Sequence, residues 1–213
     1  MIPLIQNFKT FVLADGDFPC HAIPCAFLKN ADRIICCDGA TEKLLHFGMN
    51  PDYIVGDLDS ISNELKTRFS PILFPYPDQE TNDLTKSIHF CIEHGWTEIT
   101  ILGATGKRED HTMGNLALLT DYAESTQVQL LTDYGVFVPQ LKSSVYESYA
   151  GQQVSIFSLT ASTLFTTRNL VYPIENRVLT SWWQGTLNES LAGCFTVETT
   201  GGKSLVFREY QKY

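Results

Sequence analysis

The chain has 213 residues, of which 44% are hydrophobic, 12% aromatic and 18% charged. This composition is that of a globular protein with one large domain or two modest ones, and no apolar run approaches the roughly 20 residues of a membrane-spanning helix. The formal net charge is −9, and nucleic-acid binding is set aside because it favours an excess of Lys and Arg.

The acidic excess lies entirely in the first part of the chain. Residues 1–126 carry 9 Lys and Arg against 18 Asp and Glu, whereas residues 127–213 carry 6 of each. A local excess of carboxylates suits a site that binds an anionic substrate through a divalent cation. The N-terminal sequence lacks the basic flank and small-residue cleavage site of a signal peptide, so we expect a cytoplasmic protein.

Up to residue 132, short apolar runs alternate with longer segments of helical periodicity. The runs typical of strands are 9–14 (KTFVLA), 33–37 (RIICC), 52–56 (DYIVG), 71–75 (PILFP), 98–102 (EITIL) and 128–132 (VQLLT). Between the fourth and fifth runs, Leu84, Ile88, Cys91 and Ile92 recur at helical spacing within residues 82–94. This alternation predicts a parallel sheet covered by helices on both faces, in the manner of a Rossmann-like α/β domain.

From about residue 133 the helical periodicity ends. Short runs rich in Val, Phe, Thr and Tyr follow at 135–141, 145–150, 152–160, 163–174, 177–185, 193–200 and 203–210. They are separated by Gly, Ser or Asn turns, which favours a small antiparallel sandwich or barrel. We therefore predict an α/β domain over residues 1–130 and an antiparallel β domain over residues 131–213.

Polar motifs follow four of the predicted parallel strands. They are DGA at 38–40, GDLDS at 56–60, DQETNDLTK at 78–86 and GATGKREDH at 103–111. The carboxyl ends of parallel strands meet at one edge of a sheet, where open α/β folds bind ligands. Carboxylates, a glycine-rich loop and basic side chains are therefore expected at one rim.

The pair Asp57 and Asp59 has two interpretations. Gly, Asp and Ser are common in turns, so the pair alone can be a loop. In an extended segment, however, side chains two residues apart point the same way, and two such carboxylates favour a magnesium ion between them. Asp83 and Lys86 are three residues apart at a predicted helix start and are expected to be neighbours.

The loop at 103–108 has the features of a phosphate-binding loop. Gly103 and Gly106 let backbone N–H groups approach a phosphate closely, and Lys107 and Arg108 add positive charge. The loop does not match the GxxxxGK[ST] pattern, which disfavours a P-loop NTPase. Asp110 is either a helix cap or a ligand.

The six cysteines form no CxxC pair. Cys20, His21 and Cys25 match zinc-ligand spacings poorly, and Cys36 and Cys37 lie within an apolar run. Reduced thiols are therefore expected.

Taken together, the motifs GDLDS (56–60), DQETNDLTK (78–86) and GATGKREDHTMGN (103–115) resemble those of thiamine pyrophosphokinases, supported by CDGA (37–40). The order and spacing of the motifs carry the resemblance, which extends more loosely through NLVYPI and QGTLNE to nearly the whole chain. It implies an α/β domain followed by a β-sandwich, in a homodimer whose active site combines the α/β domain of one subunit with the sandwich of the other. The implied reaction transfers pyrophosphate from ATP to thiamine and releases AMP.

The resemblance also implies residue roles. The implied catalytic carboxylates are Asp38, Asp57, Asp59, Asp83 and Asp110, of which Asp57, Asp59 and Asp83 would hold Mg²⁺ with its ATP. The implied phosphate-binding residues are Lys86, Gly103, Thr105, Gly106 and Arg108. Gln79 would face thiamine, and Asn188 would bind its pyrimidine from the partner subunit. For the deprotonation of the thiamine hydroxyl, Asp38 and Asp57 both stay open.

Aromatic side chains are candidates for contact with the cationic thiazolium of thiamine. Trp182, Trp183 and Tyr172 have this character, although packing in the core of the β domain or at the dimer interface explains them at least as well.

Three positions depart from the pattern of the family. Lys107 follows Gly106 where relatives carry a second glycine, Leu187 replaces a serine, and Ala40 replaces a glycine, which is a minor change if its φ is negative. Leu187 keeps one alternative open, an ATP-dependent enzyme with another alcohol acceptor. A second alternative is a non-catalytic nucleotide- or thiamine-binding protein, which the presence of Asp57, Asp59, Asp83 and Arg108 disfavours.

Overall fold

The structure is a computed structural model that describes residues 1–78 and 80–211. The chain divides into two compact units. The α/β unit comprises residues 8–118 and 125–133, and the β unit comprises residues 1–7, 119–124 and 134–213. The domain limits of 1–130 and 131–213 stay a prediction.

The α/β unit is built on a parallel sheet of six strands in the order β6-β5-β1-β2-β3-β4. The strands are β1 (Thr10–Leu13), β2 (Arg33–Cys37), β3 (Tyr53–Gly56), β4 (Leu73–Pro75), β5 (Glu98–Leu102) and β6 (Gln127–Leu131). β1 and the last four residues of β2, β5 and β6 are buried, as expected for strands covered on both faces. The predicted parallel sheet is confirmed.

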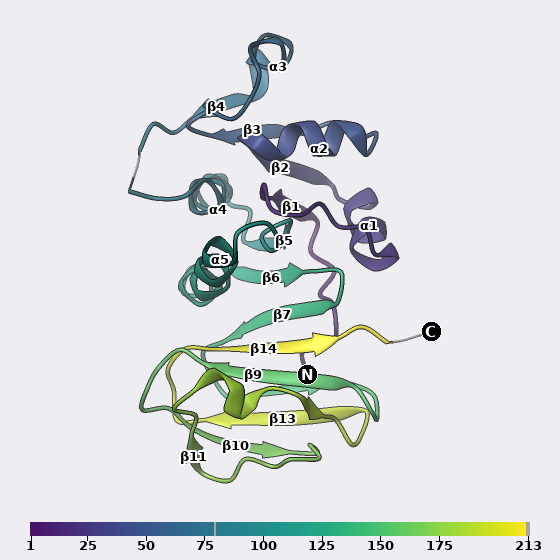
Figure 1. The fold of residues 1–213 in the computed structure, drawn as a ribbon, viewed down its shortest axis with the longest axis vertical. Helices are drawn as coiled ribbons and strands as arrows, with labels where there is room; N and C mark the ends of the chain where they lie inside the picture. The colour runs from purple at the N-terminus through teal and green to yellow at the C-terminus, as the bar shows by residue number, and fades with distance from the viewer. Residues whose placement is uncertain (79, 212–213) are drawn as a thin grey trace. The chain divides into compact units, whose positions relative to one another are not determined.

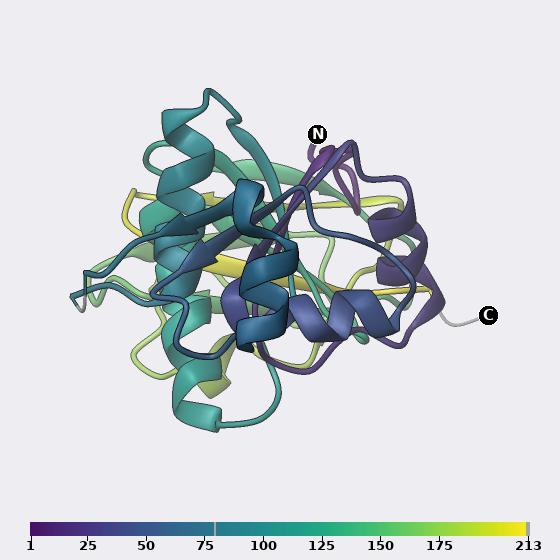
Figure 2. The same cartoon turned by 90° about the horizontal axis from the view of Figure 1, so that it is seen from above.

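Helices cover both faces of this sheet. They are α1 (Ala22–Lys29), α2 (Thr41–His46), α3 (Asn63–Arg68), α4 (Asp83–Glu93) and α5 (Glu109–Tyr122), with short 3₁₀ helices η1 (Asp38–Ala40) and η2 (Ser70–Ile72). Helices α1 and α2 lie on one face and α4 and α5 on the other (Figures 1 and 2). The predicted helix at 82–94 corresponds to α4, whose Leu84, Ile88 and Cys91 are buried against the sheet.

The strand order has a switch point at β1. From β1 the chain proceeds outward through β2, β3 and β4, and then returns to place β5 on the opposite side of β1. The carboxyl ends of β1 and β5 therefore lie at the switch point, which is where open α/β sheets bind their ligands. This topology positions the site described below.

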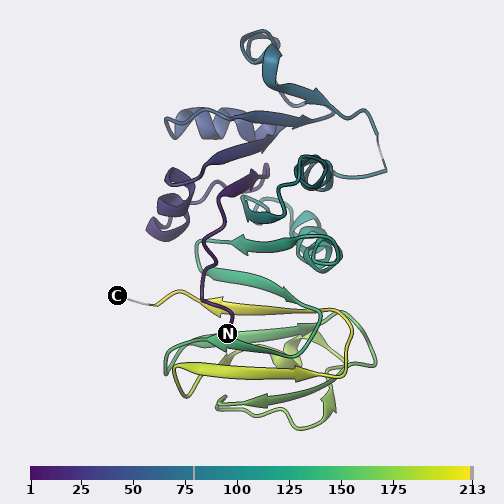
Figure 3. The same cartoon turned by 180° about the vertical axis from the view of Figure 1, so that it is seen from behind.

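The β unit contains two groups of four antiparallel strands, visible from behind in Figure 3. One has the order β12-β9-β14-β7, and the other has the order β11-β10-β13-β8. The strands are β7 (Gly135–Gln140), β8 (Ser144–Glu147), β9 (Gln153–Ser158), β10 (Leu164–Arg168), β11 (Arg177–Val178), β12 (Asn188–Glu189), β13 (Cys194–Thr199) and β14 (Ser204–Glu209). Buried and partly exposed residues alternate along β9, β10 and most of β13, so each presents one face to a core. The predicted antiparallel sandwich is confirmed.

Two predicted strands of this unit are shorter than the sequence indicated. The run at 163–174 is a strand only over β10, and the run at 177–185 has the two-residue β11 followed by a 3₁₀ helix, η3 (Trp182–Gly185). The side chains of Ser181 and Gln184 form a reciprocal capping box at the start of η3. This local hydrogen bonding competes with strand formation, although Trp and Val favour strands.

Candidate functional site

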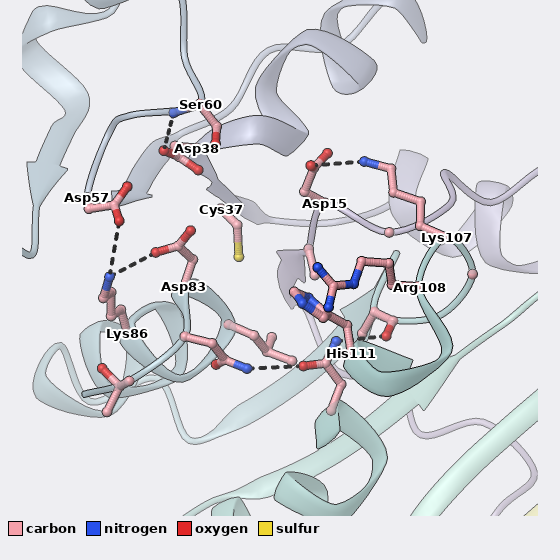
Figure 4. A pocket seen from close by; sticks show the side chains of 18 residues that line it. Asp15, Cys37, Asp38, Asp57, Ser60, Asp83, Lys86, Lys107, Arg108 and His111 are labelled. Carbon is pink, nitrogen blue, oxygen red and sulfur yellow. Dashed lines mark hydrogen bonds and ion pairs between the residues drawn. The ribbon is translucent and has the colours of Figure 1, made fainter. Parts of the chain in front are cut away.

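A cavity of about 440 Å³ lies at the carboxyl edge of the parallel sheet, in the α/β unit. It is lined by the loops that follow β1, β2, β3 and β5 and by residues of α4 and α5 (Figure 4). Of the predicted site residues, Asp38, Asp57, Asp83, Lys86, Gly106 and Arg108 line it. Its size and its polar lining suit a small charged ligand.

The segment after β3 carries the pair Asp57 and Asp59, and its backbone is not extended. Leu58 between them has a φ of 66°, and the N–H of Asp59 donates to Asp57 Oδ1 over 3.2 Å. The expectation of two side chains projecting from an extended segment is therefore wrong, because Leu58 adopts the left-handed conformation of a tight turn. The turn nevertheless keeps both carboxylates together.

Asp38 completes a group of three carboxylates with this pair. Each of Asp38, Asp57 and Asp59 offers one carboxylate oxygen, and these oxygens lie within 4.8 Å of one another. Asp38 is buried, and it accepts hydrogen bonds from Gly39 N at 2.7 Å and Ser60 N at 3.2 Å. Burial raises the pKa of the Asp38 carboxyl, and these hydrogen bonds oppose the rise. Three hard oxygen ligands this close fit a magnesium ion.

Asp83 faces a cation of the protein instead. Its Oδ1 lies 3.0 Å from Lys86 Nζ, which confirms that these residues are neighbours on the first turn of α4. The side chain of Lys86 is only 4% exposed, and its ammonium lies 4.0 Å from Asp57 Oδ2 as well (Figure 4). A buried ammonium needs such partners, and here they hold it at the cavity wall.

The glycine-rich loop after β5 is braced by the loop after β1. Gly103 O accepts from Gly16 N at 2.6 Å, and Thr105 O accepts from Asp17 N at 2.8 Å. Gly106 has a φ of 79°, and a Cβ there would collide with Asp17. Gly103 and Thr105 do not line the cavity, and their observed role is to accept these hydrogen bonds from the loop after β1. Their contact with a phosphate stays a prediction.

Arg108 and Asp110 form an ion pair at the cavity rim. Arg108 Nε lies 3.1 Å from Asp110 Oδ1, and both side chains are exposed. The hydrogen bond from Arg108 lowers the pKa of Asp110, and a bond from His111 N adds to this. Asp110 follows the first residue of α5, and His111 lines the cavity.

Two asparagines for which the sequence predicts no role connect α4 and α5 at this cavity. Asn82 caps α4 by accepting from Thr85 N at 2.9 Å, and its Nδ2 donates to Asn115 Oδ1 at 3.2 Å. Asn115 Nδ2 in turn donates to Ala104 O at 2.9 Å. Asn82 lies in the motif at 78–86 and Asn115 in the motif at 103–115. Only their contacts in the folded chain show that they link α4 to α5 and to the loop after β5.

Asp15 and Lys43 also belong to the site, although the sequence motifs predict no role for them. Asp15 follows β1 and lines the cavity, and it pairs with Lys43 from α2 and with Lys107. The available signal was an Asp-Gly pair after the first apolar run, the same signal that identified Asp38.

Cys37 forms part of the cavity floor. Burial raises the pKa of this thiol to about 12, so it stays protonated and is a poor nucleophile. All six cysteines are free thiols, as the sequence predicts.

Gln79 and Asn188 are the residues predicted to contact thiamine. Gln79 is outside the described residues. Asn188 belongs to the β unit, where it is buried; its Oδ1 accepts from Tyr172 N at 3.1 Å and its Nδ2 donates to Tyr172 O at 2.7 Å. Direct contact of Asn188 with a ligand stays a prediction, whereas its hold on the backbone of Tyr172 is observed.

A second cavity, of about 510 Å³, surrounds Asn188 within the β unit. Tyr172 and Trp183 line it and are 66% and 72% exposed, while Trp182 packs edge-on against Phe157 and donates to Ser158 O. Of the three aromatic candidates, Tyr172 and Trp183 therefore line this cavity, whereas Trp182, which is 40% exposed, does not. Leu187 lines the same cavity with a φ of 55°.

Within residues 1–78 and 80–211, the helices lack the length and apolar character that crossing a bilayer requires.

Two family models match the chain. The model described as "Thiamin pyrophosphokinase, catalytic domain" matches residues 25–131, and "Thiamin pyrophosphokinase, substrate-binding domain" matches residues 135–207. Together they cover most of both units.

Curated relatives match part of the chain. Thiamin pyrophosphokinase 1 of Caenorhabditis elegans is 32% identical over 108 residues, which are 46% of this chain and 44% of that protein. The thiamine pyrophosphokinase of Bacillus subtilis is 35% identical over 86 residues, 38% of this chain and 40% of that protein. The chain thus spans less than half the length of these relatives.

Solved structures match nearly the whole chain in fold. Thiamin pyrophosphokinase from Candida albicans superposes with a TM-score of 0.78 at 20% identity, covering 99% of this chain and 92% of that one. Thiamine pyrophosphokinase from Bacillus subtilis gives 0.77 at 21% identity, covering 96% and 100%. At these identities the likeness shows a shared fold.

Proposed function

Since the chain belongs to the thiamin pyrophosphokinase family, we propose that it is an enzyme that transfers the pyrophosphoryl group of ATP to the hydroxyethyl group of thiamine. The thiamine oxygen forms a bond to the β-phosphorus, and the bond from that phosphorus to the oxygen bridging the α- and β-phosphates breaks. The products are thiamine diphosphate and AMP. The observation that carries the proposal is the cavity at the switch point, where the buried Lys86 ammonium faces a group of carboxylates.

Positioning and neutralisation of charge are what this reaction requires of a protein. Lys86 is held by Asp83 at 3.0 Å, so its ammonium is oriented before a phosphate arrives. Arg108 is exposed at the rim, and exchange of its partner Asp110 for a phosphate oxygen costs little at such a site. These two cations would bind the transferred group from two sides of the cavity.

Asp38, Asp57 and Asp59 would hold magnesium, because their oxygens are close together and Asp38 is already fixed by two backbone N–H groups. When bound, the ion would neutralise charge on the polyphosphate. Asp83 completes the predicted magnesium set only if it leaves Lys86. Deprotonation of the thiamine hydroxyl falls to Asp38 or Asp57, which both line the cavity.

For thiamine, the cavity of the β unit supplies two exposed aromatic rings, Tyr172 and Trp183, which suit a cationic ring. We propose that this cavity faces the α/β unit of a second subunit in a homodimer. ATP and thiamine would then reach each other across subunits.

Mass spectrometry of the products from ATP, Mg²⁺ and thiamine tests this function. Thiamine diphosphate and AMP in equal amounts are expected. ADP with thiamine monophosphate would overturn the reaction type, and turnover with another alcohol but not thiamine would favour the alternative acceptor. ATP binding without any product would favour a non-catalytic binding protein.

Asp59→Asn tests the magnesium assignment. This side chain is exposed, so we expect the fold to be intact and turnover to be lost, because a neutral amide is a poor ligand for Mg²⁺. The rate of AMP formation is measured over a magnesium titration, with Asp32→Asn as a matched control outside the cavity. Retained activity with the magnesium dependence of the unmodified protein would contradict the assignment.

A further inference from the structure

Three charged side chains form a chain of contacts at the edge of the cavity in the α/β unit. Asp15 Oδ1 lies 2.6 Å from Lys43 Nζ, and Asp15 Oδ2 lies 3.0 Å from Lys107 Nζ. We call this arrangement the Lys43–Asp15–Lys107 triad. Asp15 and Lys107 line the cavity, as Figure 4 shows, whereas Lys43 does not.

Lys43 anchors the triad. Its ammonium donates to Asp15 O at 2.9 Å and to Gly16 O at 2.6 Å, besides its ion pair with the Asp15 carboxylate. An ammonium has three N–H donors, and these three acceptors occupy them. Lys43 therefore holds the loop after β1 and has no donor to offer a ligand.

Asp15 is the central member, and the surrounding backbone holds it in place. A Cβ on Gly39 would lie 2.8 Å from Asp15 Cγ, so the carboxyl group occupies the space that glycine leaves. The N–H of Gly16 is bound to Gly103 O, which ties the same loop to the glycine-rich loop. Although burial raises the pKa of Asp15, its bonds to Lys43 and Lys107 outweigh burial and keep it below its ordinary value. Asp15 is thus a fixed anion at neutral pH.

Lys107 is the member with capacity for a ligand. Its side chain is 48% exposed, and Asp15 Oδ2 engages one of its three N–H donors. Its backbone has a φ of 52°, so it continues the left-handed turn begun at Gly106, and it precedes Arg108 at the rim. Held in this way, its ammonium lies against Asp15 at the edge of the cavity.

We propose, resting on the proposed function, that Lys107 binds the polyphosphate of the substrate and that Asp15 and Lys43 are positioning residues for it. Two effects of Asp15 oppose each other. Its negative charge repels a polyphosphate, whereas its contact with Lys107 spares the ligand the entropy of ordering a long side chain. The triad predicts that positioning dominates, because the repulsion is already offset by two ammonium groups within 3.0 Å.

Calorimetric titration of the full chain with magnesium tripolyphosphate tests this inference without thiamine. Lys107→Met is expected to raise the Kd for tripolyphosphate about tenfold, because it removes one charge-assisted hydrogen bond. Asp15→Asn should raise Kd about threefold, because the ligand must then order the Lys107 side chain itself. In the Lys107→Met background, Asp15→Asn should no longer raise Kd, because the side chain that Asp15 positions is absent. Lys142→Met and Asp32→Asn are charge-matched controls outside the cavity, and they should leave Kd unchanged.

Turnover separates positioning from a general structural defect. Asp15→Asn should raise the KM for ATP with little change in kcat, and Asp15→Glu should recover part of the loss. If Asp15→Asn does not fold, tripolyphosphate binding by Lys107→Met still tests the inference, because Lys107 is exposed and its substitution should not disturb folding. A Kd of Lys107→Met equal to that of the unmodified protein would overturn the inference.

Other outcomes of the titration would also overturn the inference. Tighter binding by Asp15→Asn would mean that repulsion dominates, and an equal loss in both backgrounds would mean that Asp15 does not act through Lys107. Absence of tripolyphosphate binding by the unmodified protein would overturn the proposed function itself, together with this inference. Binding by the unmodified protein without coupling between Asp15 and Lys107 would overturn the inference alone.

Discussion

A buried lysine is stable only with partners, and Lys86 has two carboxylates at 3.0 and 4.0 Å. Lys86→Met keeps the length and apolar stem of the side chain but removes the ammonium. We expect kcat/KM for ATP to fall by a factor on the order of 10²–10³, as for other preorganised groups that stabilise transferred charge. Initial rates of AMP formation measure this effect.

The matched control for this change is Lys66→Met. Lys66 lies on α3 and does not line the cavity, so its removal alters net charge equally without touching the site. A loss of activity as large in the control would mean that net charge, and not the position of Lys86, governs binding of ATP.

Leu187 illustrates strain at a single residue. It has a φ of 55°, which an L-residue adopts at a cost, and its side chain is 77% exposed, so it gains little from packing. We expect Leu187→Gly to raise the free energy of unfolding by about 0.5–1 kcal/mol, after the greater chain entropy of glycine is subtracted. Urea unfolding measures the difference.

Leu191→Gly is the control for this prediction. Leu191 is also exposed, but its φ is not positive, so glycine should lower stability there through chain entropy alone. If both substitutions lower stability equally, the left-handed conformation of Leu187 carries no strain.

At the scale of elements, Asp133 connects the end of β6 to the start of α1. Its Oδ1 accepts from Cys20 N and His21 N, each at 2.9 Å, and its Oδ2 accepts from Cys20 Sγ at 2.8 Å. Burial raises the pKa of Asp133, but these hydrogen bonds outweigh burial and hold it below its ordinary value of 3.8. We expect Asp133→Asn to destabilise the protein by about 1–2 kcal/mol at pH 6.

The pH dependence of this effect follows from the direction of the shift. Because the pKa is lower in the folded state, the unfolded state binds the proton more tightly. The stabilisation by Asp133 is therefore complete above pH 3.8 and is lost as the pH falls through the lower, folded pKa. Urea unfolding of the unmodified protein and of Asp133→Asn is measured at pH 6 and pH 3. The difference between their free energies of unfolding should be smaller at pH 3. A larger difference at pH 3 would mean that the pKa of Asp133 is raised, not lowered, by folding.

Two elements show where a local sequence pattern predicts secondary structure correctly and where it does not. Residues 82–94 predicted α4 to within one residue at each end, because Asn82 caps it and its apolar residues recur at helical spacing. At 177–185 the same reasoning predicted a strand, but the Ser181–Gln184 capping box forms a 3₁₀ helix. Ala40 keeps a φ of −76°, so its replacement of a glycine costs no strain.

At the scale of the molecule, the proposed homodimer makes a prediction about mixed subunits. Lys86→Met alters the α/β unit, and Trp183→Ala removes an exposed ring from the β unit. If each active site combines one unit from each subunit, half of a random mixture is heterodimer with one intact site of two, which gives about a quarter of full activity. Co-expression and assay at subsaturating thiamine measure this.

Co-expression of Lys86→Met with Asp59→Asn provides the control. Both changes lie in the α/β unit, so every site of the heterodimer carries one of them and no activity should return. Equal recovery in both mixtures, or none in either, would argue against an active site shared between subunits.

Periodicity and turn chemistry are local properties, so the residue pattern alone predicts the α/β unit, the antiparallel strands that follow it and the strand ends that carry polar motifs. Tertiary structure decided which charges meet. Asp38 joins Asp57 and Asp59, while Asp83 faces Lys86. Asp15 pairs with a lysine 92 residues away in the chain, across the switch point between β1 and β5. Such pairs depend on strand order and side-chain direction, which are set by the packing of the whole sheet and which no local pattern encodes.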